Sequence, residues 1–100
     1  MILRLISYDI ESDRYRHKLA KRLEAFGFLR IQYSVFCGTH TQPQWSLCWQ
    51  TIEKLHKKYG IESDKIYVII ISRRMFKNML CIGPEPGIKM ILSEEVTMWV

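Results

Sequence analysis

The chain of 100 residues follows one plan twice: an apolar run leads into an amphipathic segment that an aromatic residue and a glycine close. The first closing pair is Phe26-Gly27 and the second is Tyr59-Gly60. Glycine readily takes the left-handed conformation in which many helices end, so each pair predicts a helix C-terminus. A regular order of strand, helix, strand, helix and strand in so short a chain favours a sheet that two helices cover.

The spacing of the apolar residues predicts where each element lies. Residues 2–8 are apolar at nearly every position, which is typical of a central strand covered on both faces. Apolar residues then recur at helical spacing before each closing pair, and Pro43 is tolerated in the first turn of the second helix. We expect strands at 2–8 and 65–72, helices at 13–26 and from about Pro43 to Tyr59, a short helical or irregular piece at 74–80, and short strands at 88–92 and 96–100.

This order favours an α+β fold, a ferredoxin-like βαββαβ sandwich with both helices on one face and an extra C-terminal strand. The fold requires one more strand before the second helix. The run from Phe28 to about Gly38 can break in two to supply it, although periodicity does not locate the break. Two faces alternate along this run: Leu29, Ile31, Tyr33 and Val35 on one, and Arg30, Gln32, Ser34 and Phe36 on the other.

A single domain is expected over residues 1–100, with the core at 1–80. The segment Gly83-Pro84-Glu85-Pro86-Gly87 forms a stiff turn that extends neither neighbouring element. Residues 81–100 are then a C-terminal strand and tail that pair with the edge of a partner protomer. Because a chain of this size buries a limited share of its surface, a homodimer is favoured.

The composition points to an anionic partner. The net charge is +5 and the pI is about 9.3, although a merely soluble basic protein is the plain alternative. The three cysteines Cys37, Cys48 and Cys81 lack the spacing of a metal cluster and are expected to be reduced thiols. No segment approaches the ~20 apolar residues that span a bilayer, so we expect a cytoplasmic protein without a membrane partner.

The end of the first strand is where chemistry is expected. The acids Asp9, Glu11 and Asp13 follow the apolar run, and a basic segment follows them, with Arg14, Arg16, Lys18, Lys21 and Arg22. A carboxylate at the end of a buried strand suits a hard cation or a general base, and the cations suit phosphate groups. Asp9 could instead accept backbone N–H groups in the turn, and Glu11 and Asp13 could favour the helix N-terminus.

Three stretches of sequence resemble the signature of a known family, the small CRISPR-associated adaptation protein that is the non-integrase partner of the CRISPR integrase. They are Tyr8-Asp9-Ile10, then Asp13 with Arg16, and then the decapeptide at 27–36, Gly-Phe-Leu-Arg-Ile-Gln-Tyr-Ser-Val-Phe. The match covers residues 1–60 well and the rest loosely. Cys37 and Lys18 depart from the residues that the family often carries at these positions.

The resemblance implies a homodimer in which Asp9 faces its twin across the interface. It implies a scaffold for the integrase that binds duplex DNA, with endoribonuclease activity on single-stranded RNA that depends on magnesium. Asp9 would be the catalytic residue and the metal ligand. Arg16, Lys18 and Arg30 would contact phosphates, together with Arg14 from the basic segment, and Ser34 and Phe36 would lie beside the site or in the dimer contact.

Magnesium chemistry supports one ion shared by the dimer. Mg²⁺ prefers six oxygen ligands and is usually held by one or two carboxylates with water and phosphate oxygens, so a single Asp9 supplies too little. Two copies related by a twofold axis would make a minimal site. Two functions therefore stay open, a binding scaffold and a metal-dependent phosphodiesterase. A third is a stand-alone toxin-type mRNA interferase of the same fold, which would act without an integrase.

Overall fold

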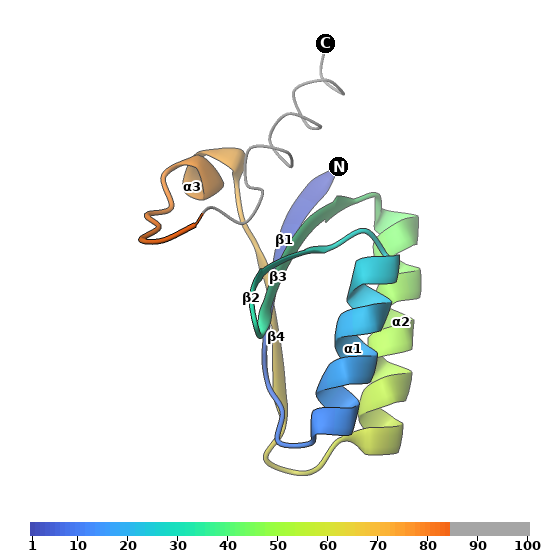
Figure 1. The fold of residues 1–100 in the computed structure, drawn as a ribbon. Coiled ribbons are helices and arrows are strands. Elements are labelled where there is room, and N and C mark those ends of the chain that lie inside the picture. The colour runs from blue at the N-terminus through green and yellow to red at the C-terminus, as the bar shows by residue number, and fades with distance from the viewer. Residues whose placement is uncertain (85–100) are drawn as a thin grey trace.

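The computed structural model describes residues 1–84 as a sheet with helices on both of its faces (Figure 1). The strands are β1 (Ile2–Asp9), β2 (Leu29–Gln32), β3 (Val35–His40) and β4 (Lys65–Ile70). The helices are α1 (Asp13–Ala25), α2 (Gln42–Tyr59) and the short α3 (Arg73–Lys77). The strands expected at 88–92 and 96–100, and the pairing of residues 81–100 with a partner, lie wholly or mainly outside the described residues.

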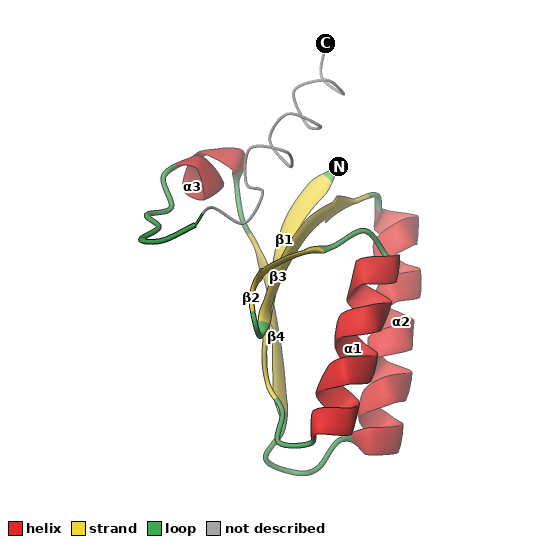
Figure 2. Ribbon diagram, viewed as in Figure 1, coloured by secondary structure: helices red, strands yellow, loops and turns green. Residues whose placement is uncertain are grey.

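The four strands lie in the order β2-β3-β1-β4, and every neighbouring pair is antiparallel. The helices α1 and α2 run side by side over one face of the sheet, while α3 lies on the other (Figure 2). The α+β sandwich expected from the sequence is therefore confirmed. None of the described helices is long and apolar enough to cross a membrane.

The break in the second apolar run lies at Tyr33 and Ser34, where β2 turns back into β3. The register shifts there, because Arg30 pairs with Phe36 while Gln32 pairs with Val35. The strand β3 continues to His40, two residues beyond the end of the apolar run at Gly38. The helix α2 then begins at once, because Thr41 caps it with a reciprocal capping box to Gln44.

The face under α1 and α2 holds the larger core. Alternation along β1 directs Ile6 and Tyr8 toward these helices, where they pack with Phe36 of β3 and with Tyr15 and Leu19 of α1. On the other face Leu3 and Cys37 pack against Phe76 of α3. Asp9 shares this second face with Leu3, Leu5 and Ser7, because it is two residues from Ser7 along the strand.

The two closing glycines act by different means. Gly27 has a φ of 85°, the left-handed conformation expected, and Phe28 beyond it donates its N–H to the Leu23 carbonyl at 3.0 Å. The same expectation was wrong for Gly60, whose φ of −73° any residue can adopt. A Cβ at Gly60 would instead lie 2.6 Å from the His56 carbonyl oxygen, so the close approach of the chain requires glycine there.

Candidate functional site at the end of the first strand

Asp9 is the last residue of β1, exposed, and paired in register with Lys65 of β4. Among residues 1–84 its carboxylate takes part in no hydrogen bond or ion pair. The alternative in which Asp9 accepts backbone N–H groups of the turn is therefore wrong. Both carboxylate oxygens are free to bind a cation.

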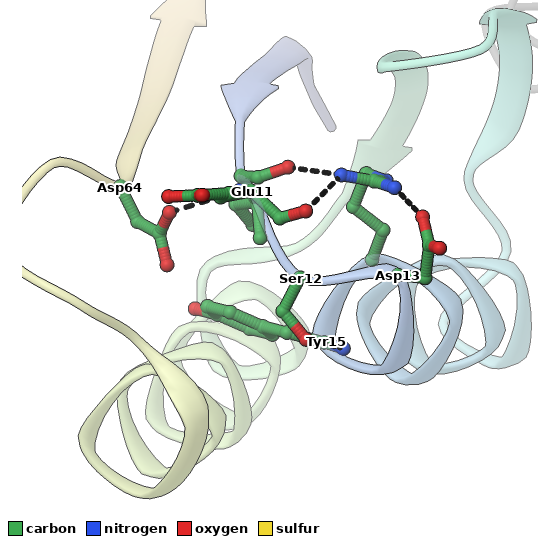
Figure 3. Close-up of polar contacts among 7 residues, drawn as sticks. Glu11, Ser12, Asp13, Tyr15 and Asp64 are labelled. Atoms are coloured by element: carbon green, nitrogen blue, oxygen red, sulfur yellow. Dashed lines mark hydrogen bonds and ion pairs between the residues drawn. The ribbon is translucent and has the colours of Figure 1, made fainter.

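Asp64, which the sequence did not single out, is the carboxylate that holds this turn. It lies in the loop between α2 and β4 and accepts the N–H of Glu11 at 3.0 Å (Figure 3). It also accepts the N–H of Ile61 at 3.0 Å. These two backbone hydrogen bonds lower the pKa of Asp64, and the charges of His56 and Arg16 add to them. The loop is thus tied to the end of the first strand across 53 positions of sequence.

Arg16 fixes the other side of the turn. Its guanidinium donates to the carbonyl oxygens of Ile10 and Glu11, the second at 2.7 Å, and forms an ion pair with Asp13 (Figure 3). The helix itself begins at Ser12, whose hydroxyl accepts the N–H of Tyr15. Arg16 therefore shapes the segment that follows Asp9, and its contact with a phosphate group stays a prediction.

The four cations predicted to bind nucleic acid divide into two groups. Arg14 and Lys18 lie beside Tyr59 at the end of α2, with cationic atoms 5.3 and 5.5 Å from the ring centre. Arg16 and Arg30 line a separate hollow of about 310 Å³ between α1 and β2. A helix turns by about 100° per residue, so positions 14 and 18 share a face that position 16 does not.

Ser34 lies beside the site, because its carbonyl accepts the N–H of Tyr8 at 3.1 Å, next to Asp9. Phe36 lies near the site, against Tyr8, but the alternative in which it forms the dimer contact was wrong. Its side chain is 0% exposed, packed in the core with Tyr8 at a ring separation of 6.2 Å, and the Arg30 guanidinium lies over it at 5.0 Å. Phe36 therefore offers no ring to a base or to a second subunit.

A metal ion fits this site only if more than one protomer contributes. Within residues 1–84 no three His, Cys, Asp or Glu side chains cluster as ligands. Asp9 offers its free carboxylate, a hard oxygen ligand of the kind that Mg²⁺ prefers. The chemistry of the residues fits magnesium if a second Asp9 joins the first.

The sequence of this chain is similar to proteins of one known family. The model of the family described as CRISPR associated protein Cas2 matches residues 1–79. A protein of Pyrobaculum aerophilum named CRISPR-associated endoribonuclease Cas2 2 is 34% identical over 82% of this chain and 87% of its own length. A protein of Methanospirillum hungatei named CRISPR-associated endoribonuclease Cas2 1 is 31% identical over 81% of this chain and 82% of its own.

One of the solved structures with a similar fold is part of a multi-protein complex. A chain of a partial Cas6-RT-Cas1–Cas2 complex superposes with a TM-score of 0.70 and 26% identity, over 86% of this chain and 96% of that one.

Proposed function

This chain belongs to the CRISPR-associated Cas2 family, and we propose that it works in CRISPR adaptation as a homodimer that holds the integrase and binds duplex DNA. One observation carries the proposal: β1 ends in the free carboxylate of Asp9 on the sheet face that α1 and α2 leave uncovered. The similarity to a chain of a complex that contains Cas1 supports an integrase partner.

The part of the second sheet face that α3 leaves exposed among residues 1–84 supports the homodimer. Tyr67 and Ile69 of β4 pair with Ser7 and Leu5 of β1, so they share the face of Asp9, and they are 59% and 47% exposed. When a second copy covers large apolar side chains on one face of a sheet, their removal from water lowers the free energy and stabilises the dimer. Two sheets packed in this way bring the first strands of both copies into one interface.

The cations around the turn support DNA binding. Arg14 and Lys18 lie on α1 and Arg30 lies on β2, and the chain carries a net charge of +5. Contacts of this kind are made to phosphate groups, so binding is expected to be independent of sequence and to weaken steeply with salt.

A second function, endoribonuclease activity, is favoured by the free state of Asp9 and by the names of the relatives. Asp9 from each subunit would hold one magnesium ion, with water and phosphate oxygens as the remaining ligands. Such an ion lowers the pKa of a bound water and offsets charge on the phosphodiester. Cleavage of single-stranded RNA would then exist only in the dimer, and Arg16 would contribute by holding the turn that positions Asp9.

Replacing Asp9 by Ala separates the two functions. The variant should lose magnesium-dependent cleavage of single-stranded RNA by at least about 100-fold, because it removes the carboxylate that is proposed to bind the ion. Integration of a duplex by the cognate integrase should stay intact, since the scaffold uses the sheet face and the cations. The matched control is Glu62→Ala, which removes an exposed acid from the loop after α2.

Cleavage gels, an integration assay and the mass of the assembly with the integrase and duplex are the readouts. Loss of integration along with cleavage in Asp9→Ala would refute the separation of scaffold from catalysis. A mass that corresponds to a lone protomer would refute the homodimer. Growth arrest on expression, without assembly with an integrase, would favour the stand-alone mRNA interferase instead.

A further inference from the structure

The turn between β2 and β3 presents an exposed aromatic ring beside the end of β1. Tyr33, the first residue of this turn, is 69% exposed. Its backbone carbonyl accepts a hydrogen bond from the hydroxyl of Tyr8 at 3.3 Å, and the carbonyl of Ser34 accepts the N–H of Tyr8 at 3.1 Å. Tyr8 immediately precedes Asp9 in β1. The backbone that carries the Tyr33 ring is therefore fixed next to the free carboxylate.

A cation supports this ring. The Arg30 guanidinium lies 5.3 Å from the ring centre of Tyr33 and 5.0 Å from that of Phe36. Because Phe36 is buried in the core, it anchors the cation that Tyr33 contacts. A guanidinium near an aromatic ring holds it by a cation–π attraction. The Tyr33 ring is thus held in place while most of its surface faces solvent, as in the aromatic platforms on which unpaired bases stack.

Tyr33 also lines the hollow of about 310 Å³ between α1 and β2. The lining of this hollow has both signs of charge, since Arg30 and Lys21 offer N–H donors and Glu24 offers a carboxylate acceptor. An acid repels a phosphate group, whereas the edge of a nucleobase carries donors and acceptors together. Because α1 forms one wall, the hollow lies on the helix side of the sheet. It stays accessible when two copies meet through the opposite face.

We propose that Tyr33 stacks on an unpaired nucleobase of a single-stranded RNA whose phosphate is bound at Asp9, with the edge of the base in the hollow between α1 and β2. This inference rests on the proposed endoribonuclease function and names a residue that selects its substrate. In a duplex the bases are paired and stacked on each other, so none is available to the ring. Tyr33 therefore favours single-stranded over duplex RNA, and it does so for any base, since every base has a flat face.

A protein partner fits this surface less well. The aromatic anchors of protein interfaces lie in well-packed pockets from which water is excluded, and lysine and glutamate are depleted there. The surroundings of Tyr33 in the hollow include Lys21 and Glu24, which form no ion pair among residues 1–84. A planar polar base leaves such side chains in contact with water or pairs with them, so it requires no dry pocket.

The test measures binding of a short, fluorescently labelled single-stranded RNA by anisotropy, in EDTA and without integrase. Tyr33→Ala should raise the dissociation constant about tenfold, because stacking on one base is lost. Tyr33→Phe keeps the ring and should bind as tightly as the wild type, whereas Tyr33→Leu should weaken binding as the alanine does. The matched control is Leu47→Ala, which removes a side chain of similar exposure, 60%, from α2 and should leave the dissociation constant unchanged.

A strand without bases separates stacking from phosphate contacts. An abasic analogue of the same length keeps every phosphate, so the wild type and Tyr33→Ala should bind it equally. The slope of log affinity against log salt should be the same in both proteins, because the substitution removes no charge. A 2-aminopurine placed in the RNA should be quenched by the wild type and by Tyr33→Phe, but not by Tyr33→Ala.

Unchanged affinity in Tyr33→Ala would overturn the proposal, as would wild-type affinity in Tyr33→Leu or failure of the wild type to bind the RNA. An equal loss of affinity for the abasic strand would overturn it too, because Tyr33 would then act through the fold or through a phosphate. Dissociation of the Tyr33→Ala dimer would make the ring a subunit contact instead. Failure of the endoribonuclease function is detected separately, by intact RNA after incubation of the wild type with magnesium, and it leaves the measurements in EDTA unaffected.

Discussion

The two faces of the sheet differ in what covers them. The face under α1 and α2 is closed by a continuous core in which Tyr15, Phe36 and Leu19 are fully buried. The other face has one small cluster of buried residues, under α3, and beyond it Tyr67 and Ile69 are exposed. Burial on the first face stabilises the protomer, whereas the second face leaves apolar area exposed. Asp9 lies on the second face, where a partner can reach it.

The largest effect is expected on the closed face. Phe36→Ala should lower the free energy of unfolding by about 3–5 kcal/mol, because it removes a fully buried ring from a well-packed core. Urea denaturation followed by circular dichroism measures this loss. The comparison variant is Phe76→Ala, which should cost less, because the five-residue helix α3 can move to fill the space. If the Phe36→Ala dimer dissociated while its protomers kept their stability, this ring would be a subunit contact instead.

An intermediate effect is expected on the uncovered face. Tyr67→Glu should raise the dissociation constant of the homodimer by about tenfold or more, since burying a charge in an apolar interface is unfavourable. The free energy of unfolding of the protomer should change by no more than about 0.5 kcal/mol, because this side chain is largely exposed. Light scattering over a dilution series measures the mass.

The control for Tyr67 comes from the closed side of the molecule. Leu47 of α2 is 60% exposed, so Leu47→Glu makes the same kind of change on the outer surface of the helix layer. It should leave the dimer intact. Dissociation in Leu47→Glu but not in Tyr67→Glu would assign the interface to the helices and reverse the comparison of the two faces.

The sequence predicted the closed face better than the uncovered one. The apolar residues that recur at helical spacing before Gly27 include Tyr15, Leu19 and Leu23. All three are buried, because a core selects apolar residues at a regular interval. The break at Tyr33 and Ser34 could not be located, since the alternation of residues 28–36 runs through it without glycine or proline. The burial of Phe36 follows from that break and was missed with it.

The site was predictable in part, for a related reason. The position of Asp9 follows from the end of an apolar run, which is local in sequence. The role of Asp64 depends on the N–H of Glu11, which is distant along the chain, and no local pattern indicates it. The sequence could have predicted that Arg16 lies apart from Arg14 and Lys18. A helix turns by about 100° per residue, which places position 16 on the side of α1 opposite to positions 14 and 18.

The smallest effect concerns the two carboxylates at this end of the sheet. Asp64 lines a hollow with Trp49 and Ile52 on the helix side, and its backbone hydrogen bonds lower its pKa, whereas Asp9 on the other face has no partner among residues 1–84. A carboxyl group whose pKa is lower in the folded chain stabilises the fold above its unfolded pKa, and this contribution is lost as the pH falls through the folded pKa. Asp64→Asn should therefore be less stable than the wild type at pH 7, and the difference should shrink as the pH falls below the ordinary carboxyl range. Asp9→Asn should keep the free energy of unfolding of the wild-type protomer at pH 7 within about 0.5 kcal/mol, because no group among residues 1–84 pairs with this carboxylate. Urea midpoints from pH 7 to strong acid provide the comparison, and a gap for Asp64→Asn that stays constant with pH would mean that the amide disrupts packing rather than removing a charge.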